Sequence, residues 1–305
     1  MSKILLSIDG GGIRSTIPAY ILDILQRTIN KPLYNCFDLI GGTSGGGIVA
    51  LGLSFLSTKE IVRLYCLEGG NIFTKKHWWY KGIHRPKYCS FMLERFLQDK
   101  FENKNLLHIK TKTFVATYDI FNSYPVLLKS WDDNFQSIKV WQAIRATTAA
   151  PTFFEPYYVE INHKEHWLID GGLYANNPAL ETYMLAKELW PNEEIILISL
   201  GTGTKKEKQL HNETKKWGLL KWLHPLFSVM FDGQDDIANM LLTNIAKTNT
   251  MFKYYRIQGE LKLADYAMDN VNSNNILNLI KDAKIIIENN KVDLNNIVRL
   301  LRRHV

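Results

Sequence analysis

The chain has 305 residues, of which 46% are hydrophobic and 22% charged, a composition typical of a soluble globular protein with a large core. Its formal net charge of +7 indicates an anionic partner, either a membrane surface or a nucleic acid. Three cysteines, Cys36, Cys66 and Cys89, form no paired pattern, which argues against a disulfide framework and favours a reducing compartment.

Neither the N-terminus nor any later segment resembles a membrane-targeting signal. Only a short apolar run precedes Asp9, and it is too short and wrongly flanked for a signal peptide. The longest mostly apolar run, Ile48–Leu56, is well short of the roughly 20 residues that a membrane-spanning helix needs. We therefore expect a cytoplasmic protein without a transmembrane segment.

Predicted strands and helices alternate from the N-terminus onward. The strands are Lys3–Ile8, Phe37–Ile40, Thr113–Tyr118, Pro125–Lys129, Trp167–Ile169, Ile195–Leu200 and Phe252–Ile257. The helices are Thr16–Thr28, one beginning at Thr58, Val140–Thr148, Pro178–Leu189, Asp235–Lys247 and one or more from Ser273 onward. This order predicts the α/β class, as a three-layer α/β/α sandwich around a mainly parallel sheet. With no repeat or long linker, we expect a single domain over residues 1–305, its helical C-terminal region (about 273–305) packed on the domain or extending from it.

One serine stands at the turn between the second predicted strand and an apolar helical run. Gly42-Thr43-Ser44-Gly45-Gly46 has the G-x-S-x-G spacing, in which a sharp strand-to-helix turn exposes the serine hydroxyl. The positions two before and two after the serine must be nearly free of side chains at such a turn. Taken alone, the motif also fits a glycine-rich turn whose serine only caps the helix.

Two further strand ends carry residues that suit acyl transfer. Gly10, Gly11 and Gly12 follow the first strand, and Asp170 follows the strand that ends at Ile169. In an open parallel sheet the carboxyl ends of strands meet at one edge, so we expect these residues to converge with Ser44. Ser44 would then be a nucleophile, Asp170 its base, and the glycine N–H groups donors to an oxyanion. Taken alone, Asp9-Gly10-Gly11-Gly12 could also be a tight turn or a weak phosphate loop, and Asp170-Gly171-Gly172 could be an ordinary turn.

These residues together resemble the signatures of patatin-like phospholipases, including their bacterial members. The stretches that carry the resemblance are Asp9-Gly10-Gly11-Gly12-Ile13-Arg14, Gly42-Thr43-Ser44-Gly45-Gly46, Asp170-Gly171-Gly172, Ala146–Phe154, Ala175-Asn176-Asn177-Pro178, Ser199–Gly203 and, for the bacterial members, Trp217–Gln234. The resemblance implies a lipid acyl hydrolase with a Ser44–Asp170 dyad and an oxyanion hole built from Gly10, Gly11 and Gly12. It also implies that Arg14 supports the glycine loop, and we expect supporting roles for Gly42, Gly46, Gly171 and Gly172.

Two departures and one alternative accompany the resemblance. Ser15 stands where the family usually has glycine, and Gly45 where it often has another small residue, but neither supplies a catalytic atom. His163 and His166 lie shortly before Asp170, yet no histidine occupies a recognisable position for a conventional triad. We therefore expect the dyad to work without histidine.

Two segments mix cations with aromatic residues: His77–Tyr88 and Lys205–Phe231. They could be solvated loops with core aromatics, or they could contact a membrane, where Trp and Leu beside Lys suit an anionic interface. Aromatic interleaving also suits single-stranded nucleic acid, but the catalytic set favours lipid.

The sequence thus predicts a serine phospholipase A-type hydrolase that cleaves acyl esters of membrane phospholipids and touches anionic membranes peripherally. No nucleic-acid partner and no cofactor are expected, and no metal, because no ligand cluster with metal spacing is visible. The sequence leaves any activating ligand or protein partner open. Two alternatives remain open: a thioesterase or acyltransferase that uses the same dyad, and a catalytically idle binding or storage protein of the same fold.

Overall fold

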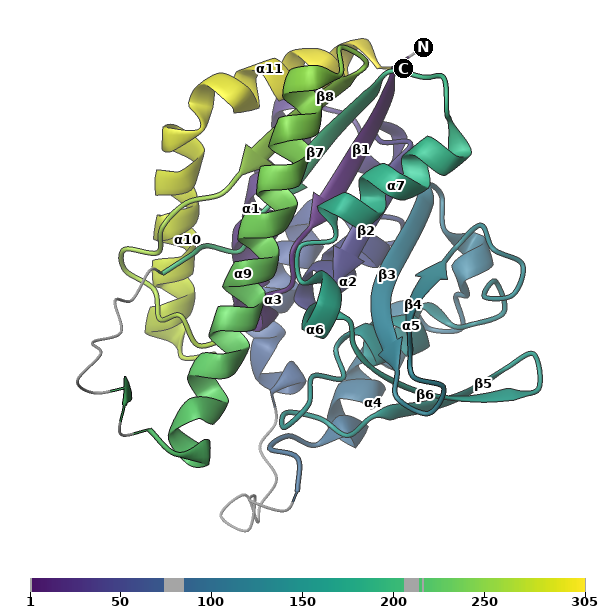
Figure 1. Cartoon of the computed structure of the whole chain (residues 1–305), viewed down its shortest axis with the longest axis vertical. Coiled ribbons are helices and arrows are strands. Elements are labelled where there is room, and N and C mark those ends of the chain that lie inside the picture. Colours follow the sequence, from purple (N-terminus) through teal and green to yellow (C-terminus); the bar gives the residue numbers. More distant parts are fainter. Residues whose placement is uncertain (1, 74–84, 206–213, 216, 305) are drawn as a thin grey trace.

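A single mixed sheet runs through the centre of the molecule (Figure 1). The computed structural model describes residues 2–73, 85–205, 214–215 and 217–304. Within this part, the sheet has eight strands, in the order β5-β6-β3-β2-β1-β7-β8, with β4 also paired to β3. The strands are β1 (Lys3–Ile8), β2 (Leu39–Thr43), β3 (Lys112–Asp119), β4 (Tyr124–Lys129), β5 (Tyr157–Ile161), β6 (Lys164–Asp170), β7 (Ile195–Leu200) and β8 (Phe252–Ile257). Neighbours among β3, β2, β1, β7 and β8 are parallel, which confirms the mainly parallel sheet.

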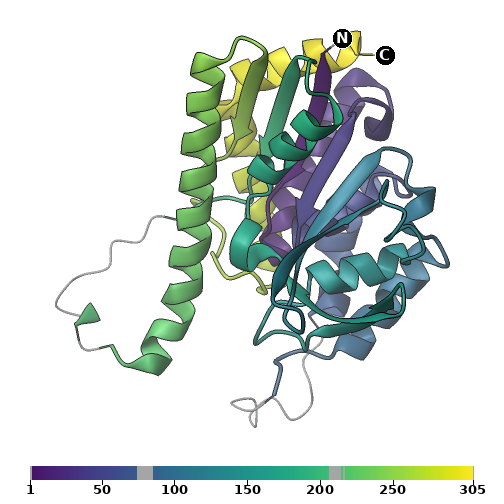
Figure 2. The same cartoon turned by 45° about the vertical axis from the view of Figure 1, so that its right-hand side comes forward.

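Helices cover both faces of this sheet and complete the three-layer α/β/α sandwich that the sequence predicts (Figures 1 and 2). They are α1 (Thr16–Ile29), α2 (Gly45–Gly52), α3 (Thr58–Ile72), α4 (Ser90–Phe101), α5 (Val140–Thr147), α6 (Gly172–Ala175), α7 (Ala179–Leu189), α9 (Leu219–Thr248), α10 (Ser273–Asn289) and α11 (Lys291–Arg303). The core on one face joins α1 to α5 with α10 and α11, and the core on the other joins α7 with α9.

Strand β1 shows how the sequence produces these two cores. Ile4, Leu6 and Ile8 belong to the core with α1, whereas Leu5 between them belongs to the core with α7 and α9. Successive side chains of a strand point to opposite faces, so a strand covered on both sides must be apolar throughout. That requirement explains the uninterrupted apolar run from Ile4 to Leu6 at the start of the chain.

The structure corrects the predicted boundaries in three places. Helix α9 begins at Leu219, well before the predicted Asp235, and it contains Pro225. A proline removes one backbone hydrogen bond and normally ends a helix, but here the helix continues on both sides, and its N-terminal end bends away from the rest (Figure 2). Helix α4 and strand β5 are elements that the sequence analysis did not predict.

The C-terminal helices α10 and α11 pack against the same core as α1. Leu279 of α10 is fully buried in that core, as are Ile297 and Leu301 of α11. Asp282 of α10 is also buried, and its carboxylate accepts the backbone N–H of Ala264 at 2.9 Å. The region from 273 to 304 therefore contributes apolar area and polar anchoring to the main core.

This packing predicts that the C-terminal region unfolds together with the sheet. Leu279→Ala should lower the free energy of unfolding by about 2–5 kcal/mol, because it leaves a cavity in a fully buried position. Leu277→Ala is the matched control, since this side chain on the same helix is 56% exposed, and it should change stability by less than about 0.5 kcal/mol. Chemical denaturation followed by both far-UV circular dichroism and tryptophan fluorescence gives the measurement. Separate transitions for the two probes would show that the C-terminal region is an independent unit.

Candidate active site

Ser44 lies on the strained turn between β2 and α2. Its backbone has φ 53° and ψ −126°, a conformation that non-glycine residues rarely adopt and that costs about 1–3 kcal/mol. The turn is possible because α2 starts in direct contact with β1: a Cβ atom added to Gly46 would lie 2.4 Å from the carbonyl oxygens of both Ile8 and Asp9. A Cβ on Gly42 would in turn lie 2.7 Å from the carbonyl oxygen of Gly46. Both glycines therefore provide the space that the sequence analysis assigned to them.

Hydrogen bonds from three neighbouring segments hold this turn in place. The backbone N–H of Ser44 donates to the hydroxyl of Thr147 at 3.0 Å, and that hydroxyl donates to the carbonyl of Ala116 at 2.6 Å. The hydroxyl of Thr43 donates to the carbonyl of Ala175 at 2.7 Å, and that of Tyr65 donates to the carbonyl of Gly45 at 2.5 Å. None of these hydrogen bonds uses the hydroxyl of Ser44.

Asp170 lies close to Ser44 because of a strand pairing that the sequence did not predict. It is the last residue of β6, which runs antiparallel to β3 and pairs with only three residues of that strand, Thr117–Asp119. In the parallel neighbour β2, Thr43 lies opposite Ala116 of the same strand β3. Asp170 lies opposite Thr117, the residue of β3 that follows Ala116. Asp170 and the turn at Ser44 therefore lie at the same end of β3, on either side of it. The expectation of three parallel strand ends is therefore wrong for β6, although the side chains do come together.

The carboxyl of Asp170 is 5% exposed, and burial raises its pKa to about 7. Removal from water penalises the charged form of a carboxyl group. Hydrogen bonds from the side chain of Ser44 and from the N–H of Gly172, the latter at 2.8 Å, act in the opposite direction. A base with a pKa near neutrality is well matched to accept a proton from a serine hydroxyl at physiological pH.

The glycine loop offers two free N–H groups rather than three. The N–H of Gly10 donates to the carbonyl of Asn176 at 2.8 Å, so it is occupied in this conformation. Within the described part of the chain, the N–H groups of Gly11 and Gly12 have no such partner, and both residues line the cavity in front of Ser44. Gly12 has φ 54°, and a Cβ there would lie 2.2 Å from the carbonyl oxygen of Met268. Of the three glycines expected to donate, Gly10 has its N–H occupied in this conformation, and Gly11 and Gly12 stay candidates.

Arg14, Gly171 and Gly172 lie where supporting roles would place them. The buried guanidinium of Arg14 donates to the carbonyl of Gly203 at 3.2 Å and lies 4.1 Å from the centre of the Tyr266 ring. A Cβ on Gly171 would lie 2.4 Å from the backbone of Ala116, so β6 can end against β3 only with glycine at this position. Gly172 supplies the N–H that binds Asp170.

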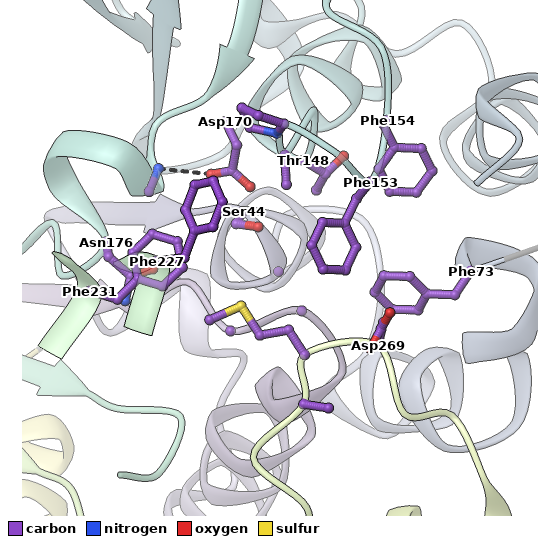
Figure 3. Close-up of a pocket in the computed structure, with 18 of the residues that line it drawn as sticks. Ser44, Phe73, Thr148, Phe153, Phe154, Asp170, Asn176, Phe227, Phe231 and Asp269 are labelled. Atoms are coloured by element: carbon purple, nitrogen blue, oxygen red, sulfur yellow. Dashed lines mark hydrogen bonds between the residues drawn. The ribbon is translucent and has the colours of Figure 1, made fainter. Parts of the chain in front are cut away.

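Ser44 and Asp170 line a mainly apolar cavity of about 270 Å³, in which Phe227 and Phe231 lie on one side of Ser44 and Phe73 and Phe153 on the other (Figure 3). Its apolar lining consists of aliphatic and aromatic side chains and one methionine: Ile48, Ile72, Phe73, Phe153, Phe154, Leu173, Phe227, Phe231 and Met268. At its rim, the ammonium group of Lys87 pairs with the carboxylate of Asp269, which also accepts the hydroxyl of Tyr88 at 2.6 Å. A mainly apolar cavity lined by Ser44 has the character of a site that could hold an acyl chain with its carbonyl carbon next to the serine hydroxyl.

None of the histidines that the structure describes lines this cavity. His166 is buried but turned to another partner: its Nδ1 lies 2.7 Å from the carboxylate of Asp119, which also accepts the N–H of Phe121 at 3.0 Å. His163 is fully exposed at a turn. Across the described residues, no group of three or more His, Cys, Asp or Glu side chains is arranged to hold a metal ion.

The two cation-aromatic segments are only partly described. Residues 77–84 of the first segment and residues 206–213 and 216 of the second lie outside the described residues. On α9, Phe227 and Phe231 line the cavity, whereas Trp222, Leu226 and Val229 are exposed to solvent, Trp222 with 41% of its surface. No helix in the described ranges is long and apolar enough to cross a membrane.

Several residues that shape the site were not singled out from the sequence. Thr147 and Asn176 lie inside stretches that carried the family resemblance, but their partners, the N–H groups of Ser44 and Gly10, could not be inferred from the spacing. Phe231 and Met268 come from segments far along the chain, and only packing reveals that they close the cavity over the glycine loop.

The chain is similar to known proteins over most of its length. Residues 6–183 match the family model described as patatin-like phospholipase. Patatin-like protein 2 of Oryza sativa subsp. indica is 27% identical to the chain, over 95% of this chain and 85% of its own length. Probable inactive patatin-3-Kuras 1 of Solanum tuberosum is 28% identical, over 83% and 77%. The crystal structure of VipD from Legionella pneumophila aligns with 93% of this chain and 67% of its own, with 12% identity and a TM-score of 0.45.

Both of these sequence relatives are plant proteins, so the predicted placement among bacterial members stays a prediction. The family model covers more than half of the chain, and it includes the glycine loop, Ser44 and Asp170. The chain therefore belongs to the patatin-like phospholipase family.

Proposed function

We propose that the protein is a phospholipase A-type lipid acyl hydrolase that works through a Ser44–Asp170 dyad. The Ser44 hydroxyl attacks the carbonyl carbon of a fatty-acyl ester while Asp170 takes its proton. The N–H groups of Gly11 and Gly12 donate to the resulting oxyanion, and the alcohol leaves with a proton returned by Asp170. A water molecule activated by the same carboxylate then releases the fatty acid from Ser44.

One observation carries this proposal. A serine on a strained turn hydrogen-bonds to a buried carboxyl whose pKa is raised to about 7. Gly11 and Gly12, whose N–H groups have no partner among the described residues, line the same cavity. A plain helix cap would need neither the carboxyl nor the cavity. Oxyanion donors of this kind contribute on the order of 3 kcal/mol each to transition-state stabilisation. Family membership supports lipid acyl hydrolysis as the reaction class.

Two alternatives share the same residues. A thioesterase or acyltransferase would form the same acyl-enzyme with another donor or acceptor, and product analysis with competing thioesters and alcohols separates them. A relative named as probably inactive keeps an idle protein among the alternatives. Lipid mass spectrometry of mixed phospholipids before and after incubation shows whether the protein hydrolyses phospholipids, and the competing thioesters then separate a thioesterase from an idle protein.

The first prediction for this mechanism concerns Ser44. Ser44→Ala should lower ester hydrolysis more than about 10⁴-fold and abolish labelling by a fluorophosphonate, with the thermal midpoint close to wild type. Ser44→Gly should be equally inactive but about 1 kcal/mol more stable than Ser44→Ala, because glycine accepts φ 53° without strain. Activity assays and differential scanning calorimetry test both statements. Turnover that survives in purified Ser44→Ala would remove Ser44 from the mechanism.

The second prediction concerns the ionisation of Asp170. A carboxyl base must be charged, and burial raises the pKa of Asp170 to about 7, so kcat/KM should be lost as the pH falls through about 7. Asp170→Asn should lower kcat by about 10²–10⁴-fold above pH 7, and the difference from wild type should shrink as the pH falls below 7. It should also unfold at a higher temperature than wild type at pH 8, because a raised carboxyl pKa destabilises the folded protein as the pH rises.

Two histidine variants provide the controls for this profile. His163→Gln removes an exposed side chain, and His166→Gln removes the partner of Asp119, so both should keep most of the turnover and the same midpoint. Loss of turnover in any folded histidine variant would contradict a two-residue mechanism.

We further propose that the N-terminal half of α9 docks on anionic membranes. Its outer side chains Trp222, Leu226 and Val229 are exposed, and Phe231 of the same helix reaches the cavity. Lysines are dense around it in the sequence, at Lys205, Lys206, Lys208, Lys215, Lys216 and Lys221. Each lysine near an anionic surface adds about 1 kcal/mol of attraction. A phospholipid could then pass from the bilayer to Ser44 along one helix.

The third prediction tests this surface. Binding to vesicles should increase with the content of anionic lipid and decrease with salt, since exposed charges are screened over about 8 Å at physiological ionic strength. Leu226→Glu should weaken sedimentation with vesicles, whereas Leu277→Glu, a leucine of similar exposure on α10, should not. Equal binding of wild type to neutral and anionic vesicles would contradict the electrostatic part, and equal loss in both variants would contradict the role of α9.

A further inference from the structure

A buried arginine lies behind the glycine loop and takes no part in the chemistry proposed above. Arg256, on the edge strand β8, has a side chain that is 10% exposed. Its Nη1 donates to Asp9 Oδ1 at 3.0 Å and to the hydroxyl of Ser199 at 2.7 Å. Its Nη2 donates to Asp9 Oδ2 at 2.5 Å and to Asp235 Oδ1 at 2.6 Å. The guanidinium therefore binds Asp9 with both of its terminal nitrogens and still reaches a second carboxylate.

Asp9 is the residue that joins β1 to the three glycines. Its N–H donates to the carbonyl of Leu200 at 3.0 Å, and its carboxylate is held by Arg256, so the backbone is anchored on both sides just before Gly10. Glycine has the largest conformational freedom of all residues, and three in succession do not hold a single conformation unaided. The direction of the N–H groups at Gly11 and Gly12 therefore depends on anchors outside the loop.

The second carboxylate belongs to α9, which holds the other side of the same loop. Asp235 accepts the side-chain amide of Asn177 at 2.7 Å, and its neighbour Gln234 accepts the N–H of Asn176 at 2.9 Å. The carbonyl of Asn176 accepts the N–H of Gly10 at 2.8 Å. The contacts thus form a closed ring that runs from Arg256 through Asp9, Gly10, Asn176 and α9 back to Arg256.

The charges make this ring depend on the arginine. Asp9 and Asp235 are 3% and 16% exposed at their side chains, and two carboxylates so close together repel each other. Burial raises the pKa of Asp9, and the Arg256 guanidinium acts against that rise. A buried charge whose partner is removed is strongly destabilised, so without Arg256 the carboxylates would separate or take up protons.

We propose that Arg256 is a positioning residue for the hydrolysis: by binding Asp9 and Asp235 together, it ties the glycine loop to α9 and sets the direction of the oxyanion donors. This inference rests on the proposed function of the site. Arg256, on the edge strand β8, would then affect the transition state rather than substrate binding. A displacement of donors by about 1 Å is enough to cost about 10²-fold in rate.

Arg256→Lys is the main test, because lysine keeps the charge but lacks the planar fork that binds two carboxylates at once. We expect kcat to fall about 10- to 100-fold while KM stays within about twofold. A trifluoromethyl ketone that forms a tetrahedral adduct with Ser44 should lose affinity in proportion to kcat. A non-hydrolysable ether phospholipid, which resembles only the substrate, should bind as it does to wild type. A merely structural role would lower the fraction of labelled Ser44 but not the turnover per labelled site.

Lys253→Met is the matched control, since it removes an exposed cation from the same strand, one paired with Glu194 at 2.7 Å, and should leave kcat and KM unchanged. If Arg256→Lys does not fold, Asp235→Asn decides the question: it keeps the side-chain shape, and kcat should fall about 3- to 10-fold at constant KM. Wild-type kcat in folded Arg256→Lys, or in Asp235→Asn where the lysine variant does not fold, would overturn the inference. Wild type that neither hydrolyses an ester nor binds the ketone would overturn the proposed function, and this inference with it.

Discussion

The whole site depends on one close contact between backbones, where the first turn of α2 lies against the end of β1. At Gly46 there is no room for even a Cβ atom, because the carbonyl oxygens of Ile8 and Asp9 would lie 2.4 Å away. A Cβ on Gly45 would similarly lie 2.7 Å from the carbonyl of Gly12. The turn at Ser44 and the glycine loop therefore lie in direct backbone contact, and the distance between them is set by backbone packing rather than by flexible side chains.

Helix α9 combines two tasks that are usually separate. Its inner aromatic side chains, Phe227 and Phe231, form part of the cavity wall, and one turn later Gln234 binds both Leu173 and Asn176 through its amide. The tyrosine that covers Arg14, Tyr266, donates to Asp232 of the same helix at 2.8 Å. A shift of α9 would thus change the volume offered to an acyl chain and, at the same time, the loops around Ser44.

The fold class and the residues that carry the motifs could be predicted from the sequence. The hydrogen-bond partners of these residues and the strand pairing that brings them together could not. The strand-to-helix turn at Ser44 was predictable because local glycine spacing alone makes it possible. The occupied N–H of Gly10 was not, because its partner Asn176 is distant in the chain and binds through a backbone carbonyl that every residue has. The extension of α9 through Pro225 was missed since local propensity opposes it and tertiary contacts of its later turns support it.

Because Asp170 lies at the end of β6, the groups around Ser44 come together late as the chain is synthesised. Asp170 meets Ser44 only after β6 has turned back and paired with the last three residues of β3, and Arg256 arrives later still with β8 at the opposite edge of the sheet. A chain that leaves the ribosome N-terminus first therefore carries Ser44 long before Asp170 and Arg256 have been added. A site that works as proposed is therefore complete only when nearly all of the sheet has formed.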